Sequence, residues 1–117
     1  MEEKYQQLCM MLRQLGVSSY DGRFSQTAYA GALCAEQPDR LRSLIMRVYS
    51  ETAARYGTSW MAVEMNINAV SEMVQKENRA GFEALTGYSL CRGSGAGLFL
   101  AALVSALDRE PTPAGKE

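Results

Sequence analysis

The chain has 117 residues, which is the length of one domain, and its 47% apolar and 21% charged content excludes wholesale disorder. The formal net charge is −1, whereas a typical nucleic-acid-binding domain is clearly basic. There is no histidine, which excludes Ser-His-Asp and Cys-His catalytic arrangements and the commonest zinc ligand outside all-cysteine sites. We therefore expect a protein that is not an enzyme and that uses no metal and no cofactor.

The cysteines and the longest apolar run bear on the cellular compartment. Cys9, Cys34 and Cys91 lie far apart and form no C-x-x-C pair, which indicates free thiols in a reducing cytosol rather than a disulfide framework. The first residues show no signal peptide. The longest apolar run, 98–107, is broken by Ser105 and is roughly half the length that spans a bilayer. We expect a cytoplasmic protein with no membrane partner.

Helical periodicity recurs along the chain, and no alternating strand pattern or hairpin signal accompanies it. A first helix is predicted over 2–15, with Gly16 as its C-terminal stop. Its apolar stripe consists of Tyr5, Leu8, Leu12 and Leu15. A second helix is predicted from Ser25 or Gln26 to Ala35. This segment is rich in alanine, and its small residues allow close packing against a neighbour.

A third helix is predicted to begin at Pro38, which fits the first helical position, and to end near Arg55. Its apolar residues at helical spacing are Leu41, Leu44, Ile45, Val48 and Tyr49. A break follows at 56–58, where Gly57 can adopt a positive φ. Either Thr58 or Ser59 can then cap the next helix.

Three more helices are predicted after the break, over 60–75, 78–85 and 98–108. Asn78 can cap the second of these, and Gly87 can end it. A glycine-rich loop, 91–97, precedes the last helix.

Together these elements predict an all-α fold class: one six-helix domain over 1–110, followed by a flexible tail over 111–117. Two helices joined by a short glycine turn are typical of a helix-turn-helix, here over about 38–75. In that motif the second helix enters the major groove of DNA.

The predicted helix 60–75 has one face that favours burial and one that favours exposure. The predicted buried stripe is Val63, Ile67, Val70 and Val74. The opposite face carries Met61, Ala62, Met65, Asn68, Ala69 and Glu72. No lysine or arginine occurs over 57–75, which is unusual for a helix that lies against phosphates. This face is either simply solvated or binds a partner, and composition does not separate the two.

Basic residues flank this helix on both sides. They are Arg47, Arg55, Lys76, Arg79 and Arg92. Such residues can hold a phosphate backbone without reading bases, because backbone contacts position a protein while base contacts specify the sequence. The alternative is a scattering of solubilising charges.

The stretch 48–59, VYSETAARYGTS, followed by Val63, Glu64, Ile67 and Glu72, resembles the C-terminal effector domain of the sporulation master response regulator of Firmicutes. The segments 12–17, LRQLGV, and 85–88, LTGY, fit the same domain in the same order, so the similarity covers most of 5–109. The resemblance implies a six-helix fold whose fourth helix enters the major groove of promoter DNA. It therefore implies a transcription regulator.

The recognition helix departs from the family's pattern. Thr58 and Glu64 keep the family's residue types, and Arg55 keeps its basic character. Arginine positions of the family carry other residues here, and so does its histidine position. These residues are Ala62, Met65 and Asn68 at the arginine positions and Ala69 at the histidine position. A bidentate arginine–guanine contact gives about 1–3 kcal/mol of discrimination, so we expect most sequence reading to be lost.

Two hypotheses follow from the sequence. In the first, the helix-turn-helix binds double-stranded DNA with weak or altered specificity, and Asn68 reads adenine while Glu64 reads cytosine. The expected DNA contacts are Arg55, Thr58, Ser59, Glu64, Met65, Asn68 and Arg92. In the second, the domain is a non-reading copy that binds protein, either itself as a homodimer or a related regulator. The expected partner contacts are Met61, Ala62, Met65 and Ala69.

Overall fold

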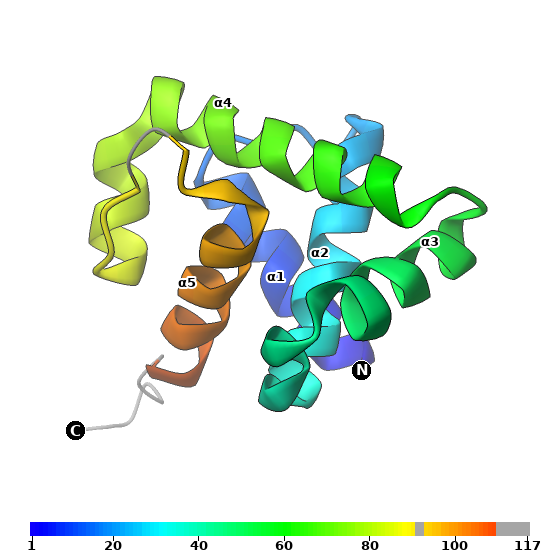
Figure 1. The fold of residues 1–117 in the computed structure, drawn as a ribbon. Coiled ribbons are helices and arrows are strands. Elements are labelled where there is room, and N and C mark those ends of the chain that lie inside the picture. Colours follow the sequence, from blue (N-terminus) through cyan, green and yellow to red (C-terminus); the bar gives the residue numbers. More distant parts are fainter. Residues whose placement is uncertain (91–92, 110–117) are drawn as a thin grey trace.

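The computed structural model describes residues 1–90 and 93–109, and every regular element in these ranges is helical (Figure 1). This confirms the all-α class. The expected tail at 111–117 lies outside the described residues. The α-helices are α1 (Glu2–Gln14), α2 (Gly22–Glu36), α3 (Ser50–Tyr56), α4 (Trp60–Thr86) and α5 (Gly95–Arg109). A 3-10 helix, η1 (Pro38–Arg42), and a π-helical turn, η2 (Ile45–Tyr49), lie between α2 and α3.

The described part of the chain has five α-helices, so the prediction of six was wrong. The predicted fourth and fifth helices form one element, α4, with a kink at Asn78, whose φ of −152° and ψ of 46° are not helical. As predicted, Asn78 acts as a cap, because its Oδ1 accepts a hydrogen bond from the N–H of Gly81 at 3.2 Å. Its Nδ2 donates to the carbonyl of Leu15 at 3.3 Å, which ties the kink to the end of α1.

The predicted third helix is divided into η1, η2 and α3. Pro38 does begin a helical turn, but the backbone leaves helical geometry at Ser43, with φ −140° and ψ 60°. Arg40 bridges the break, because its guanidinium donates to the carbonyl of Arg47 and pairs with Glu51 at 2.9 Å. Since η2 winds as a π-helix, the side chains there do not follow the 3.6-residue period that the prediction assumed. Ile45 is consequently exposed, whereas Val48 and Tyr49 are buried.

Helix α2 lies at the centre of the molecule and contacts α1, α3, α4, α5, η1 and η2 (Figure 1). Its buried residues are mostly small: Phe24, Thr27, Ala28, Ala30, Gly31, Ala32, Leu33, Cys34 and Ala35. Gly31 sets the closest approach, since a Cβ at that position would lie 2.7 Å from Leu8 Cδ1 on α1. The close packing expected of the alanine-rich segment is therefore confirmed.

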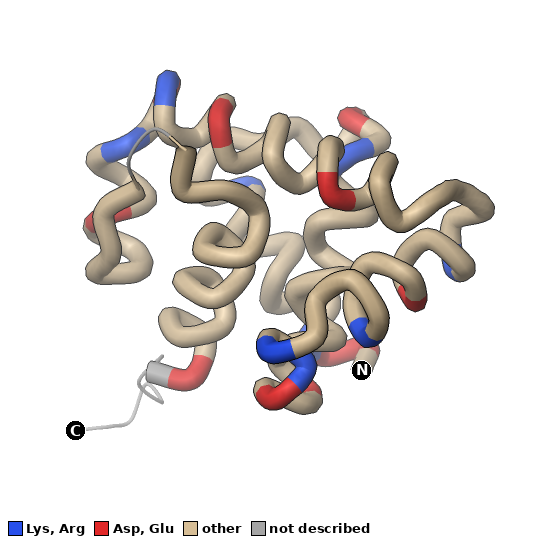
Figure 2. The backbone as a smooth tube through the Cα atoms, viewed as in Figure 1, with Lys and Arg blue, Asp and Glu red and all other residues tan. Residues whose placement is uncertain are grey.

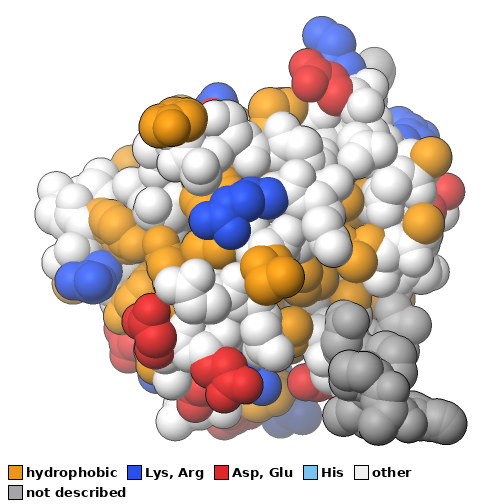
Figure 3. All heavy atoms as spheres, turned by 180° about the vertical axis from the view of Figure 1, so that it is seen from behind, with side chains coloured by type: hydrophobic (Ala, Val, Ile, Leu, Met, Phe, Trp, Pro, Cys, Tyr) orange, Lys and Arg blue, Asp and Glu red, His pale blue; other side chains and the backbone are white. Residues whose placement is uncertain are grey.

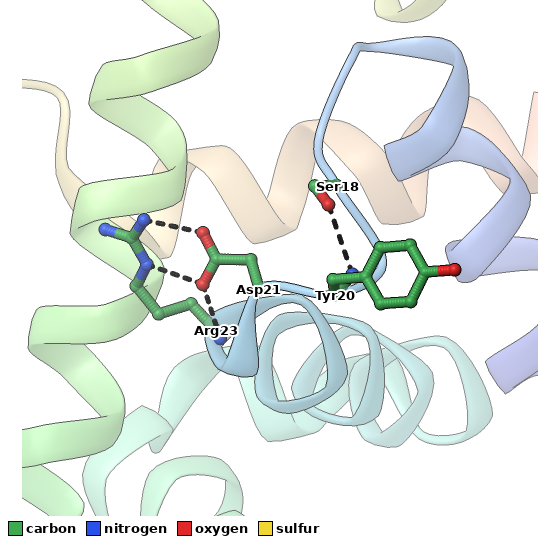
Figure 4. Close-up of polar contacts among 4 residues, drawn as sticks. All are labelled: Ser18, Tyr20, Asp21 and Arg23. Atoms are coloured by element: carbon green, nitrogen blue, oxygen red, sulfur yellow. Dashed lines mark hydrogen bonds and ion pairs between the residues drawn. The ribbon is translucent and has the colours of Figure 1, made fainter.

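Helix α2 begins earlier than predicted because Asp21 caps it (Figure 4). Asp21 Oδ1 accepts hydrogen bonds from the backbone N–H and from the Nε of Arg23, both at 2.9 Å, and Oδ2 accepts from Nη2 at 2.6 Å. Hydrogen bonding to Arg23 lowers the pKa of the Asp21 carboxyl below its usual value of 3.8. In the turn before it, Ser18 Oγ accepts from the N–H of Tyr20 at 3.2 Å.

The last two helices, α4 and α5, pack against each other. The kink at Asn78 turns the end of α4 back along α5 (Figure 1), where the Phe82 and Phe99 rings stack with centroids 5.5 Å apart. Most of α5 is buried against α2 and α4. Helix α5 begins at Gly95, within the loop predicted at 91–97.

Replacing Gly31 with alanine tests the contact between α1 and α2. Overpacking in a filled core costs about 1–3 kcal/mol, and the better helix propensity of alanine offsets up to about 1 kcal/mol. Because Leu8 is fully buried, we expect G31A to lower the free energy of unfolding by about 1 kcal/mol in urea denaturation. G22A is the control, since nothing lies within 4 Å of a Cβ there. Equal stability of the two variants would contradict the packing argument.

The charge on Asp21 predicts a pH dependence of stability. Its pKa is lowered in the folded state, so its contribution is complete above pH 3.8 and is lost as the pH falls below that value. D21N keeps a capping oxygen and removes the charge. We expect it to be less stable at pH 7 by less than about 1 kcal/mol, since the pair is partly solvated. This difference in the free energy of unfolding should shrink below pH 3.8 in urea titrations. A constant difference down to pH 3 would refute the stabilising role of the Asp21 charge.

Candidate nucleic-acid and partner interface

Helices α3 and α4 are joined by three residues, 57–59. Gly57 ends α3 in the left-handed conformation, with φ 68° and ψ 39°, which strongly favours glycine. Ser59 Oγ accepts a hydrogen bond from the N–H of Ala62 at 3.1 Å and caps α4. Of the two candidate caps, the structure selects Ser59. The Thr58 side chain is exposed, and its backbone N–H donates to the carbonyl of Ala53 at 2.9 Å.

The predicted buried stripe of α4 is confirmed. Its residues Val63, Ile67, Val70 and Val74 are at most 1% exposed. We call the opposite side of the helix the α4 outer face, which consists of Met61, Ala62, Met65, Ala69 and Glu72. The side chains of Met61 and Met65 are 57% and 68% exposed, whereas Ala62 and Ala69 are half-buried. The outer face therefore presents two unpacked methionines to solvent.

Glu64 and Asn68 lie beside the outer face and border a groove. This groove has a volume of about 570 Å³. Its other walls are residues 41–46 and Tyr49 from the η1–η2 region and residues 95–97 at the start of α5. Both Glu64 and Asn68 are half-buried. The two residues that the sequence assigned to base reading thus stand at the edge of the helix, turned toward its neighbours.

Tyr49 forms part of the groove wall and is 2% exposed. Burial, and next the negative charge of Glu64, raise the pKa of the Tyr49 hydroxyl to about 12. It therefore stays neutral at physiological pH.

Burial also raises the pKa of the Cys9 thiol, and raises that of Cys34 to about 12, so both cysteines are protonated free thiols. Cys91 lies outside the described residues.

The sequence did not indicate two exposed apolar residues on the other side of the groove. Met46 is 75% exposed and Ile45 is 43% exposed, and both line it. A 3.6-residue period places Ile45 with the core residues, and only the π-helical winding of η2 shows its exposure. Exposed apolar side chains thus occur on η2 as well as on α4, and those of η2 line the groove. The space-filling view shows a face of the molecule on which hydrophobic side chains are interspersed with polar and charged ones (Figure 3).

The flanking basic residues fall into two groups. Arg47 is engaged, because it donates to Gln37 Oε1 at 3.2 Å and pairs with Asp39 at 3.3 Å. Arg55, Lys76 and Arg79 are exposed, and no ion pair engages them within residues 1–90 and 93–109. Arg92 lies outside the described residues.

The exposed cations stand at the two ends of the cation-free part of α4. Arg55 precedes the turn at Gly57, and Lys76 and Arg79 follow at the kink. Between them α4 carries only acidic charges, Glu64 and Glu72 (Figure 2). Lys76 and Arg79 share a surface depression of about 330 Å³ with Glu72, Gln75 and Gly93. The arrangement places positive charge at both ends of a neutral to acidic face.

Comparison with protein-family models and with curated proteins finds no match for this chain. Within the described residues, no helix is long and apolar enough to cross a membrane. No group of three histidine, cysteine or carboxylate side chains in those residues is arranged to hold a metal ion.

Proposed function

We propose that this chain is a regulator domain of the helix-turn-helix type that binds double-stranded DNA mainly through the phosphate backbone. The observation that carries the proposal is the placement of exposed cations on both sides of the 60–75 stretch of α4, with Arg55 before it and Lys76 and Arg79 after it, and none within it. From Trp60 to Lys76 a helix is roughly 24 Å long, whereas the major groove is about 12 Å wide. This stretch laid across the groove would therefore bring the cations that flank it, Arg55 on α3 and Lys76 and Arg79 at the kink, toward the phosphates on either side.

The connection between α3 and α4 supports this proposal, because a capped helix follows a three-residue glycine turn, as in helix-turn-helix proteins. The sequence resemblance to the effector domain of the sporulation regulator supports promoter DNA as the ligand. Base reading is expected to be weak, since Met65 stands at the centre of the outer face. Asn68, at its edge, is the candidate for contact with adenine.

Fluorescence-anisotropy titration of labelled promoter-like and scrambled duplexes at two salt concentrations tests DNA binding. Each phosphate contact contributes about 0.9 to the slope of log affinity against log salt. We expect K76A/R79A to weaken binding to both duplexes and to reduce this slope by about 1 to 2. K4A/R13A, which removes the same charge from α1, is the control, and thermal unfolding measures the effect of losing the contact between Arg13 and the Phe24 ring. Salt-independent affinity, or equal effects of the two double variants, would argue against the proposal.

A second candidate function is protein binding through the α4 outer face, either to a second copy or to a related regulator. The exposure of Met61 and Met65 on the α4 outer face favours it, because unbranched, polarizable methionine side chains adapt to varied partner surfaces.

Sedimentation of the purified chain over a range of concentrations tests this second function. We expect M65E to abolish self-association, since it places a charge in the centre of the proposed contact. M10E is the control, because Met10 is similarly exposed but lies on α1. An association that M65E leaves unchanged would show that the outer face is not the interface.

A further inference from the structure

Arg55 is held against two aromatic rings. Its guanidinium carbon lies 5.9 Å from the ring centroid of Tyr56, the next residue along the chain, and 5.9 Å from that of Tyr29 on α2. Both distances are within the range of cation–π attraction. An exposed arginine at the end of α3 is thus attached to the central helix by a contact between distant parts of the chain.

The two rings, which we call the tyrosine platform, are themselves fixed. Tyr29 and Tyr56 meet edge to face, with centroids 5.9 Å apart and an interplanar angle of 82°. The Tyr56 hydroxyl donates to the carbonyl of Ser25 on α2 at 3.4 Å. Burial, and next the neighbouring Tyr5, raise the pKa of Tyr56 to about 12, so this donor stays protonated at physiological pH.

The platform leaves the hydrogen-bonding groups of Arg55 available. The ring contacts do not occupy the guanidinium N–H groups, whose forked arrangement fits two oxygens of a phosphate. A side chain that is already ordered loses less conformational entropy when it binds a ligand. Arg55 and the two tyrosines line a surface depression of about 210 Å³. Glu2 also lines this depression but makes no ion pair with Arg55 within residues 1–90 and 93–109.

We infer that Tyr29 is a positioning residue that holds the Arg55 guanidinium ready for a backbone phosphate at the start of α4. The identity of the anion as a DNA phosphate rests on the proposed function. The preordering of Arg55 does not rest on it, because the contacts belong to the free protein.

Relaxation of the Arg55 ¹⁵Nε nucleus in the free protein tests the preordering without DNA. We expect Y29L to lower the order parameter of this group, and Y29F, which keeps the ring, to restore it. Y20L is the control, since Tyr20 is 98% exposed and its ring lies against no arginine within residues 1–90 and 93–109. If Arg55 is as mobile in the unmodified protein as in Y29L, the inference is wrong.

Duplex affinity then tests the consequence for binding. We expect Y29L to weaken binding about 2- to 5-fold, as loss of an exposed cation–π contact implies, and Y29F to rescue it. Y29L should cause no further loss when Arg55 is already alanine, because one residue acts through the other. Additive losses would overturn the inference. If the unmodified protein binds no duplex, the proposed function fails, and the relaxation experiment still decides the role of Tyr29.

Thermal unfolding shows whether Y29L remains folded, and R55K provides a second route if it does not. Lysine keeps the charge of Arg55 but lacks its planar, forked group. We expect R55K also to weaken duplex binding about 2- to 5-fold. Binding by R55K as tight as that of the unmodified protein would overturn the role of the guanidinium that the tyrosine platform holds.

Discussion

The close approach that small residues permit around α2 is the constraint on which the remaining structure depends. A helix with bulky side chains on every side could not contact six other elements in a chain of this size. Alanine and glycine let those elements share one core, and the large side chains come from the surrounding helices, as Leu8 and Phe99 do. The position of Arg55 depends on the same helix, since Tyr29 and the carbonyl of Ser25 are part of α2.

Local features of the fold were predictable from the sequence, because they depend on neighbouring residues. The valine and isoleucine stripe of α4, the turn at Gly57 and the cap at Asn78 each follow from spacing or from one residue's backbone preference. The number of helices did not follow. Asn78 leaves helical geometry at the expected cap, and its side chain bonds the end of α1, but the helical stretches on either side join across the kink as one element, α4.

The candidate site was less predictable because it depends on contacts between distant segments. The sequence identified the cation-free helix and the basic residues around it, but it did not indicate which of these cations form ion pairs within the protein. Arg47 is held by Gln37 and Asp39 across the η1–η2 bend, a bend that periodicity does not reveal. The proximity of Tyr29 to Arg55 likewise requires α2 and α3 to be packed together. The sequence alone predicts neither the ion pair of Arg47 nor the contact between Tyr29 and Arg55, because both depend on how distant segments pack.

The burial of Cys34, Tyr49 and Tyr56 has a consequence for how the molecule responds to its surroundings. Their pKa values, each raised to about 12, lie far above neutrality, and the chain has no histidine, the side chain whose ordinary pKa lies between 5 and 8. These three side chains therefore keep the same charge over the small pH changes of a living cell, and they do not alter the surface potential around α4. Ionic strength has the larger effect, since it screens exposed charges such as Lys76 and Arg79 over about 8 Å at physiological salt.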